Sequence, residues 1–479
     1  MTKYEHLIDI QQNIVKETCT EYASLNERHI QVIWLEQKYF RPLKTHSGKS
    51  IEVVSPGIWN AEEGPDFKKA YLIIDGEDYF GDVEIHLSDQ GWKQHEHHLD
   101  SNYNNVIFHL SLWNSASNKE IITQNNKKIE SGYLQDSLTI SHKRIMQLID
   151  LDLYPYKKFC GTGQCAEKLF KNLSQIKTIE LFQDASEWRL LKKKERLEAR
   201  IEHPELYFSA GIAMALGYKK NTEPFIDLFL KLINNTKLTN DQLLAMGMNL
   251  FGYFNDYYLK YWEHSPYYNE LHRLAKEIES INTSQSPLYL AHIRPINHPI
   301  RRIVYLIHLI KDPRLFYFLS IFEKCWNDNW MKIKTKKEQK DFLIKLSSLI
   351  PSYIDTYWSY HYTFESKPQN KLIPLIGNPL KTEIIINTLL PLIHTSISER
   401  ENFHEMQAFF DFYSTIKSQE SQKSKYLKQR FFGNGTKGDL LKKANLLQGA
   451  YQIHHDFCVH YESSCKGCPF VEKYKNYYE

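Results

Sequence analysis

Acidic side chains with the spacing of a metal site lie in residues 60–109. Asp66 follows a Gly-Pro turn, and Glu84 lies in the next strand-like run with Asp82 and His86 two positions to either side. Alternate side chains of a strand point to the same face, so Asp82, Glu84 and His86 should line up. Carboxylates from two neighbouring strands suit a hard cation, and we expect Mg²⁺ or Mn²⁺.

Histidines are concentrated in the same segment. Five of the chain's 21 are His86, His95, His97, His98 and His109. We expect His97 and His109 to join Asp66, Glu84 and Asp82 as metal ligands, since imidazole with carboxylate also suits Zn²⁺, Mn²⁺ or Fe²⁺. His86 can orient or deprotonate water near pH 7. The alternative is that these histidines are structural and bond to the backbone or to one another.

The order of these residues resembles the PD-(D/E)xK nuclease fold. In that fold an acid after a turn is joined by an acidic-x-Lys triplet on the next strand. Asp66 after Pro65 resembles the first part, and Glu84 to His86 resembles the second. The resemblance implies that Asp66, Glu84 and the carbonyl of Ile85 hold a metal that activates water for phosphodiester hydrolysis.

The resemblance also implies a catalytic glutamate on the preceding helix, for which Glu27 is the first candidate and Glu36 the second. One position departs from the pattern, because His86 stands where the fold has lysine and supplies no fixed positive charge. Two alternatives to a nuclease therefore remain. One is a non-catalytic nucleic-acid-binding or assembly protein with a degenerate core, and the other is a metal hydrolase with a different substrate.

Three of the seven cysteines lie close together in FCVHYESSCKGCPF, near residue 460. Cys465 and Cys468 have the Cys-x-x-Cys spacing of metal ligands, and Cys458 is a third. A fourth ligand is required, and we name Cys160, with Cys165 as its neighbour in KFCGTGQC. The histidines His454, His455 and His460 are alternatives. Four such ligands would suit an iron–sulfur cluster or Zn²⁺, and the alternative is a set of reduced structural thiols.

Some iron–sulfur nucleases of the recombination exonuclease type are similar, since they combine a PD-(D/E)xK core with three late cysteines and one distant cysteine. There the lone cysteine precedes the core, whereas Cys160 follows it.

Basic side chains that could bind nucleic acid lie between the 60–109 segment and the late cysteines in the sequence. The candidates are Lys192, Lys193, Lys194, Arg294 and Arg302. They are suited to a phosphate backbone. The lysines could equally form a solvated helix face. RPINHPIRR could equally be a helix start with Asn297 as cap and Pro299 in the first turn.

The helices and strands expected around these residues indicate an α+β protein. A helix with the buried stripe Ile30, Ile33 and Trp34, capped by Asn26, precedes strands near 51–54, 70–76, 78–87, 105–114 and 127–134. Helical periodicity then dominates, with blocks at 222–235, 240–262, 267–280, 300–326 and 337–363. We expect an N-terminal mixed-sheet, nuclease-like α/β domain at 1–150. A helical domain at 151–440 and a C-terminal helix with the Cys-rich segment at 441–479 would follow.

Composition limits the class of protein. A chain of 479 residues is long enough for two or three domains, and its net charge of +3 is not that of an evident polyanion binder. No run of about 18 apolar residues predicts a membrane span, and the first residues do not resemble a secretory signal. An odd number of unevenly spread cysteines fits a reducing compartment. We expect a cytoplasmic protein with no membrane partner.

Several blocks together resemble one family. They are ERHIQVIW, GPDF, GDVEIH, YNNVIFH, RPINHP and the late QGAYQIHHDFC with CKGC. They are similar to the bacterial domain-of-unknown-function 2851 family, and the resemblance runs from about Glu27 to Cys468. It implies that these blocks belong together and brings no established activity.

Overall fold

Two units make up the part of the chain that can be described. The computed structural model describes residues 3–8, 25–60, 63–114, 120–149, 151, 154, 161–218, 221–278, 288, 294–461, 465 and 467–478. Unit 1 comprises 1–185, 422–439 and 449–479, and unit 2 comprises 186–421 and 440–448. Each unit is therefore assembled from segments that are far apart in sequence.

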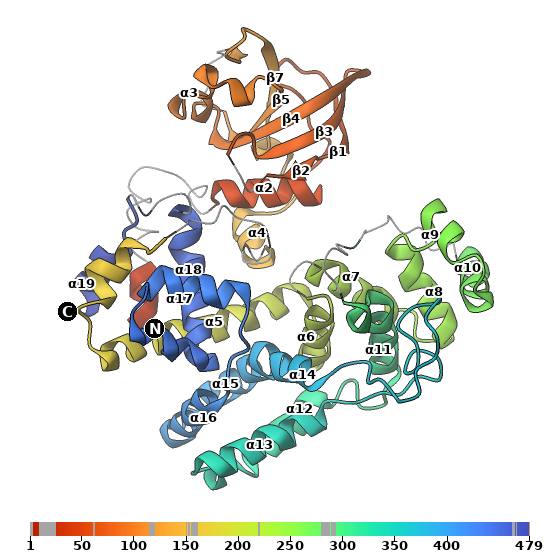
Figure 1. Cartoon of the computed structure of the whole chain (residues 1–479), viewed down its shortest axis with the longest axis vertical. Coiled ribbons are helices and arrows are strands. Elements are labelled where there is room, and N and C mark those ends of the chain that lie inside the picture. Colours follow the sequence, from red (N-terminus) through yellow and green to blue (C-terminus); the bar gives the residue numbers. More distant parts are fainter. Residues whose placement is uncertain are drawn as a thin grey trace. The chain divides into compact units, whose positions relative to one another are not determined.

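A mixed sheet, orange in Figure 1, holds the N-terminal part of unit 1 together. Its strands, among the residues described, follow the order β1-β3-β4-β5-β7-β6, and β2 also pairs with β3. β1, β3 and β4 are antiparallel, β4, β5 and β7 are parallel, and β6 is antiparallel to β7. The strands are β1 (Ile51–Ser55), β2 (Ile58–Trp59), β3 (Phe67–Ile74), β4 (Glu77–Ser88), β5 (Val106–Trp113), β6 (Ile121–Ile122) and β7 (Lys128–Tyr133).

The connection from β4 to β5 carries the histidine-rich sequence. Parallel neighbours cannot be joined by a tight turn and need a crossover. Here the crossover contains α3 (Gly91–Gln94) and two 3-10 turns, His97–Leu99 and Ser101–Tyr103. It therefore returns the histidines to the sheet beside the strand that carries Glu84.

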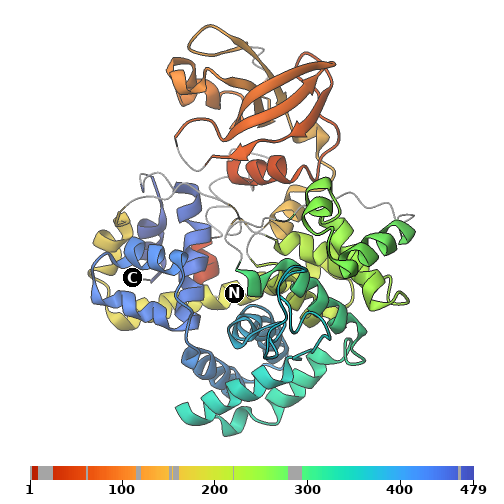
Figure 2. The ribbon, with the colours of Figure 1, turned by 45° about the vertical axis from the view of Figure 1, so that its right-hand side comes forward.

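Helix α2 (Glu27–Glu36) packs on the sheet, as both views show (Figures 1 and 2). Asn26 caps it as expected, in a reciprocal capping box with His29. Ile30, Ile33 and Trp34 are fully buried, and the Trp34 ring stacks on Phe108 of β5 at a centroid distance of 6.0 Å. The buried stripe predicted from the sequence is thus the face that packs on the strands.

The remaining elements of unit 1 bring the chain ends together. They are α4 (His142–Leu148), a π-helical turn (Ala166–Phe170), the start of α5 (Gln175–Arg200), α17 (Gln422–Phe432), most of α18 (Ala444–Asp456), the 3-10 turn Cys458–Tyr461 and α19 (Phe470–Tyr478). The hydroxyl of Tyr4 donates to Asp456, and the ammonium of Lys473 donates to the carbonyl of Leu7, at 2.9 and 2.8 Å. The helical residues 3–8 consequently lie against the C-terminal helices.

Unit 2 is helical, with a core of aliphatic and aromatic side chains. Its helices are the rest of α5, then α6 (Tyr207–Leu216), α7 (Thr222–Ile233), α8 (Asn240–Leu250), α9 (Asp256–Tyr261), α10 (Pro266–Ile278), α11 (Pro299–Lys311), α12 (Phe318–Asn327), α13 (Lys336–Leu349), α14 (Asn378–Ile384), α15 (Leu390–Glu399) and α16 (Phe403–Thr415). None of the helices in the described part of the chain combines the length and apolarity needed to cross a membrane.

The α+β class and the order of a mixed sheet before a helical region are confirmed. The division into units differs from the boundaries expected at 150 and 440. Residues up to 185 belong with the sheet in unit 1, and so do 422–439 and 449–479.

Candidate metal centre

Two backbone hydrogen bonds hold the carboxylates of Asp66 and Glu84 at the start of β3 and the middle of β4. The amide of Asp66 donates to Glu84 Oε2, and the amide of Ile85 donates to Asp66 Oδ2, each at 3.0 Å. Gln31 of α2 donates through Nε2 to Asp66 Oδ1 at 2.9 Å. Asp66 and Glu84 are 9% and 5% exposed, so these donors compensate two buried charges. The two acids are brought together, as the sequence indicated.

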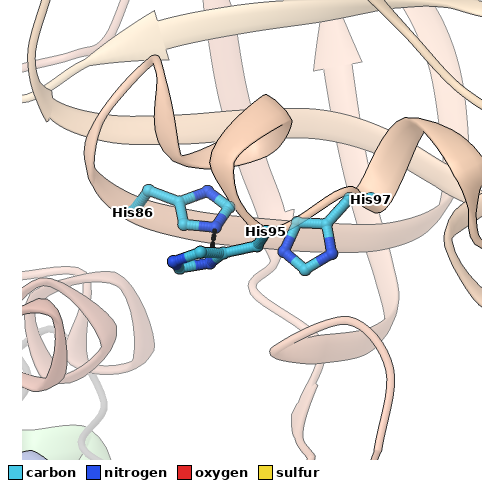
Figure 3. Close-up of side chains that lie close together, drawn as sticks. All are labelled: His86, His95 and His97. Carbon is cyan, nitrogen blue, oxygen red and sulfur yellow. Dashed lines mark hydrogen bonds between the residues drawn. The ribbon is translucent and has the colours of Figure 1, made fainter. Parts of the chain in front are cut away.

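Three imidazoles meet beside Glu84. His86 comes from β4, His95 follows α3, and His97 begins a 3-10 turn, and Figure 3 shows their rings close together. One ring nitrogen from each lies within 4.8 Å of the other two. His86 and His97 are buried, and His95 is exposed. The cluster therefore has two sheltered ligand candidates and one at the surface.

Three separations among Glu84 and the three histidines are close to the edge length of a coordination tetrahedron. His86 Nε2 lies 3.1 Å from His95 Nδ1, and Glu84 Oε1 lies 3.2 Å from His97 Nε2 and 3.6 Å from His86 Nε2. A tetrahedral ion with metal–nitrogen bonds of about 2.0–2.1 Å places its ligands about 3.3 Å apart. His86 with His95, and Glu84 with His97, are therefore spaced as pairs of ligands on one ion would be, and the three imidazoles form the group whose ligand atoms are all mutually close.

His109 supports the cluster from the neighbouring strand. In the parallel pairing of β4 and β5 it lies opposite Glu84, and its Nε2 is 2.8 Å from His86 Nδ1. Burial is the main cause that lowers the pKa of His86 well below its usual value, and burial lowers the pKa of His109 to about 3. Both rings are consequently neutral at pH 7, the form that can bind metal. His109, expected as a ligand, instead contacts a ligand candidate and orients it.

A close approach of α3 fixes the ring of His86. A β-carbon added to Gly91 would lie 2.5 Å from two atoms of that ring, so only glycine leaves room. A second contact within the crossover is the Tyr103 ring, which stacks on His97 with a centroid distance of 3.9 Å. Trp92 packs edge-on against both His97 and His109. The crossover thus holds its histidines through aromatic contacts.

Asp82 has a structural role and does not join the cluster. Its Oδ1 accepts the amide of Lys69 at 3.1 Å. Lys69 has φ +60° and lies where the pairing of β3 with β4 is interrupted between Phe67 and Ala70. Asp82 therefore stabilises a β-bulge, a feature often found beside active sites. The expectation that Asp82 binds the same metal as Glu84 is not supported, because the bulge uses its carboxylate.

Glu27 is half-buried at the first position of α2. Its charge acts on Tyr103, whose pKa is raised first by burial and then by Glu84, Asp66, Asp100 and Glu27. Gln31, one helical turn later on α2, donates to Asp66. Sequence reasoning missed Gln31, although its position four residues after Glu27 puts both on one helix face.

The basic candidates in unit 2 have protein partners. Lys192 pairs with Glu195 at 2.9 Å and Lys194 with Glu198 at 2.6 Å. Lys193 is half-buried and donates to Asn387 and Gln448. These lysines therefore form ion pairs and hydrogen bonds with other side chains of unit 2.

The RPINHPIRR segment forms a helix start. Arg302 is 3% exposed and donates to the carbonyl of Leu375 and the hydroxyl of Tyr218. A buried guanidinium with these partners is not presented to phosphate, whereas Arg294 is exposed. Pro299 is the first residue of α11 as expected, but the cap is His298 and not Asn297.

The late cysteines gather with Cys165. Cys165 and Cys458 are buried, and Cys465 and Cys468 are half-buried. Burial and the nearby thiols Cys458, Cys465 and Cys468 raise the pKa of Cys165, in that order of importance. Cys160, the expected fourth ligand, lies outside the described residues.

Comparison with known proteins identifies a family without an assigned role. The model of a family described as "protein of unknown function (DUF2851)" matches residues 27–422. No curated protein and no solved structure matches the chain. The match covers Glu84, the histidine cluster and Cys165 and ends before the late cysteines, although the resemblance in the sequence extends to Cys468. Because it spans most of the chain, this protein belongs to the DUF2851 family.

Proposed function

We propose that this protein is a metal-dependent hydrolase that cleaves phosphodiester bonds in nucleic acid. The observation that carries the proposal is the convergence of the His86, His95 and His97 imidazoles, with the Glu84 carboxylate 3.2 Å from His97 and 3.6 Å from His86. The adjacent Asp66 is held by three hydrogen-bonded contacts with α2 and β4. Such a group of buried ionisable side chains is costly to keep without a bound partner.

The donor atoms fit a transition metal better than Mg²⁺. Three imidazole nitrogens and one carboxylate oxygen suit Zn²⁺, Mn²⁺ or Fe²⁺, whereas Mg²⁺ prefers oxygen ligands and bound water. A divalent ion at this position supplies Lewis-acid chemistry, lowering the pKa of a water molecule and stabilising charge that develops on a phosphate. Of the Mg²⁺ and Mn²⁺ expected first from the sequence, this donor set supports Mn²⁺.

The protein's own residues orient the ligands. His86 can present Nε2 to an ion while Nδ1 bonds to His109, an arrangement that fixes the ring of a metal ligand. With both nitrogens in use, His86 fits a ligand better than a proton-transfer base. Asp66 presents a carboxylate already bound by Gln31 and Ile85, and Tyr103 limits the rotation of His97 by stacking.

Phosphodiester is the substrate class that the order of site residues favours. Asp66 after Pro65 at the start of β3, and the Glu84-x-His86 triplet on β4, resemble the PD-(D/E)xK pattern. The succession of α2, three antiparallel strands, a helical crossover and a parallel strand is compatible with it.

A pocket next to α3 favours a second candidate, a metal hydrolase with a substrate other than nucleic acid. The pocket has a volume of about 360 Å³ and shares Trp92 with the wall of the histidine cluster. Its charged lining is mixed, with Asp89 and Glu120 beside Lys93. A mixed lining of this size suits a small polar substrate better than a polyanion.

Metal analysis combined with hydrolysis assays tests the proposal. The full-length protein is stripped with chelator, reloaded with Zn²⁺, Mn²⁺ or Mg²⁺, and assayed on labelled DNA, labelled RNA and a small phosphate ester. We expect binding of Mn²⁺ or Zn²⁺ and cleavage that requires it. His95→Ala should weaken metal binding and activity at least tenfold, because it removes one of the three imidazole ligands, and its exposed side chain contributes little to packing.

His98→Ala is the control, since His98 lies three residues after His95, in the 3-10 turn that begins at His97, but does not belong to the cluster. It should bind metal and cleave substrate as the unaltered protein does. Cleavage that survives Glu84→Ala together with His97→Ala would rule out this site. Metal-dependent cleavage of the small ester without cleavage of DNA or RNA would support the second candidate and reject the first.

A further inference from the structure

Four cysteines from distant parts of the chain come together in unit 1. Cys165 precedes a π-helical turn, Cys458 begins a 3-10 turn after α18, and Cys465 and Cys468 precede α19. The thiols of Cys458, Cys465 and Cys468 all act electrostatically on Cys165. Cys165 lies 293 positions before Cys458, so its approach to the three late thiols is not a consequence of local sequence.

Backbone contacts hold the Cys165 loop against the late segment. The amide of Gln164 donates to Cys465 Sγ at 3.4 Å, and its side-chain amide donates to the carbonyl of Cys465. The amide of Gly163 donates to the carbonyl of Arg430 at 2.8 Å. A β-carbon on Gly163 would lie 2.9 Å from that carbonyl oxygen and 3.3 Å from Cys165 Sγ. Glycine at 163 is therefore what allows Cys165 to approach the other thiols.

A buried cation accompanies the thiols. Arg430 of α17 is 1% exposed, and its guanidinium hydrogen-bonds Cys458. Cys458 and Cys465 are among the groups whose negative charge acts on Arg430. A buried guanidinium requires a negative partner nearby, and a metal cluster held by thiolates would supply that charge.

Aromatic side chains cover the same region. Phe457 and Phe470, each next to the cysteine-bearing segment, have ring centroids 4.9 Å apart, and Phe170 lies 6.2 Å from Phe470. All three are essentially buried. A hydrophobic covering of this kind limits the access of solvent to a metal centre.

The spacing of the sulfurs distinguishes one ion from a cluster. Among the residues that the structure describes, the group whose ligand atoms all lie within 4.8 Å of one another is the histidine group. No three of the four sulfurs are therefore that close. A single Zn²⁺ with bonds of about 2.3 Å would hold sulfurs about 3.8 Å apart. A cluster with a separate iron behind each thiolate requires wider spacing.

We propose that Cys165, Cys458, Cys465 and Cys468 together bind an iron–sulfur cluster in unit 1. This inference is independent of the hydrolase proposal, because none of the four cysteines belongs to the histidine cluster. The cluster would join the segment before α5 to the segment before α19.

Metal content and colour test the proposal directly. The full-length protein is purified without oxygen, and its visible absorbance, iron, acid-labile sulfide and zinc are measured. We expect a brown protein that contains iron and sulfide in equal amounts and bleaches when sulfide is lost. Cys165→Ser and Cys468→Ser should each lose most of the iron and the visible absorbance.

Two matched variants serve as controls. Cys160→Ser lies five positions before Cys165, and Cys325→Ser removes another buried cysteine, from the core of unit 2. Both should keep iron, sulfide and colour. Circular dichroism and size-exclusion chromatography on every variant separate loss of the cluster from loss of the fold, and Cys468, which is half-buried, is less coupled to packing than the buried Cys165.

Three outcomes would overturn the inference. Protein that is colourless and contains one zinc but no iron would replace the cluster with a single ion. A folded Cys165→Ser variant that retains full iron would remove Cys165 from the ligand set. Loss of iron in Cys160→Ser but not in Cys165→Ser would assign the fourth position to Cys160.

Discussion

Gly91 determines whether the ring of His86 can take its position. The ring lies against the first turn of α3, where any β-carbon would overlap it. Gly91→Ala should therefore displace His86 even though alanine is the better helix former. We expect the free energy of unfolding to fall by about 1–3 kcal/mol, as in other overpacked sites. Metal affinity should fall as well, and chemical denaturation and metal titration measure the two effects.

Gly377→Ala is the control for that substitution. A β-carbon there meets its nearest neighbour, Pro379, at 3.6 Å, an ordinary contact. Its φ of −98° is also accessible to alanine. The control should cost no more than about 1 kcal/mol, because alanine is a poorer N-cap than glycine, and should leave metal affinity unchanged. Equal stability and equal metal affinity in both variants would show that Gly91 does not constrain His86.

For individual residues, the sequence predicted which side chains make up the candidate site better than it predicted how they are arranged. Asp66, Glu84 and the histidines were identifiable because ionisable groups rarely alternate along a buried strand. Asp82 alternates with Glu84 and His86 along β4 in the same way, but its carboxylate accepts the amide of Lys69 in the bulge. Gln31 carries no charge, so no pattern of acids and histidines points to it.

Strand pairing brings the histidines of separate segments together. Glu84 on β4 lies opposite His109 on β5, and His86 shares that face two residues later. Diagonal neighbours on one face of a sheet are within reach of long or aromatic side chains, which accounts for the contact between His86 and His109. The period-2 pattern predicted the shared face, but not which strand would pair with β4 in parallel.

Helix ends were harder to predict than helices. The block expected at 240–262 is broken after α8, where Gly252 adopts φ +75°. The block expected at 337–363 ends with α13 at Leu349, two residues before Pro351, because proline disfavours helix in the residue that precedes it. Periodicity identifies the buried face of a helix but continues through short breaks.

Helix α11 has a cap that titrates. His298 Nδ1 accepts the amide of Ile300, at 3.3 Å, and burial followed by the charge of Arg301 lowers the pKa of His298 to about 4 from 6.5. The unfolded chain therefore binds the proton more readily than the folded one. The contribution of His298 to stability is complete above about pH 6.5 and is lost as the pH falls through about 4.

We expect the thermal midpoint to decrease over that pH range partly through His298. Asn is a good N-cap that does not titrate, so His298→Asn should keep the helix capped and flatten the decrease. Thermal unfolding of both proteins, followed by circular dichroism from pH 7 to about pH 4, measures the difference. Parallel pH profiles for the two proteins would exclude His298 as a source of acid sensitivity.

Both units are discontinuous, and this property of the whole molecule is the one that the sequence predicted least. Local patterns identify elements, but the return of 449–479 to unit 1 depends on contacts between residues that are hundreds of positions apart. The choice between Cys160 and Cys165 shows the consequence. The spacing in the sequence suits both cysteines, and it is the contacts of Gln164 with Cys465 that bring the Cys165 segment to the late cysteines.

The contacts of Tyr4 give a test of this discontinuous organisation. Tyr4 is fully buried, its hydroxyl donates to Asp456 at 2.9 Å, and nearby His6 stacks on Tyr477. Tyr4→Ala should cost about 3–5 kcal/mol, the range for truncating a buried aromatic side chain. Because its partners belong to unit 1, hydrogen exchange should accelerate in the end of α18 and in α19, and remain unchanged in α8 and α11 of unit 2.

The control is Tyr257→Ala, which replaces a tyrosine of unit 2 that is 66% exposed and should leave exchange unchanged in all four helices. Equal acceleration in α8 and α19 after Tyr4→Ala would instead mean that the two units open as one cooperative structure.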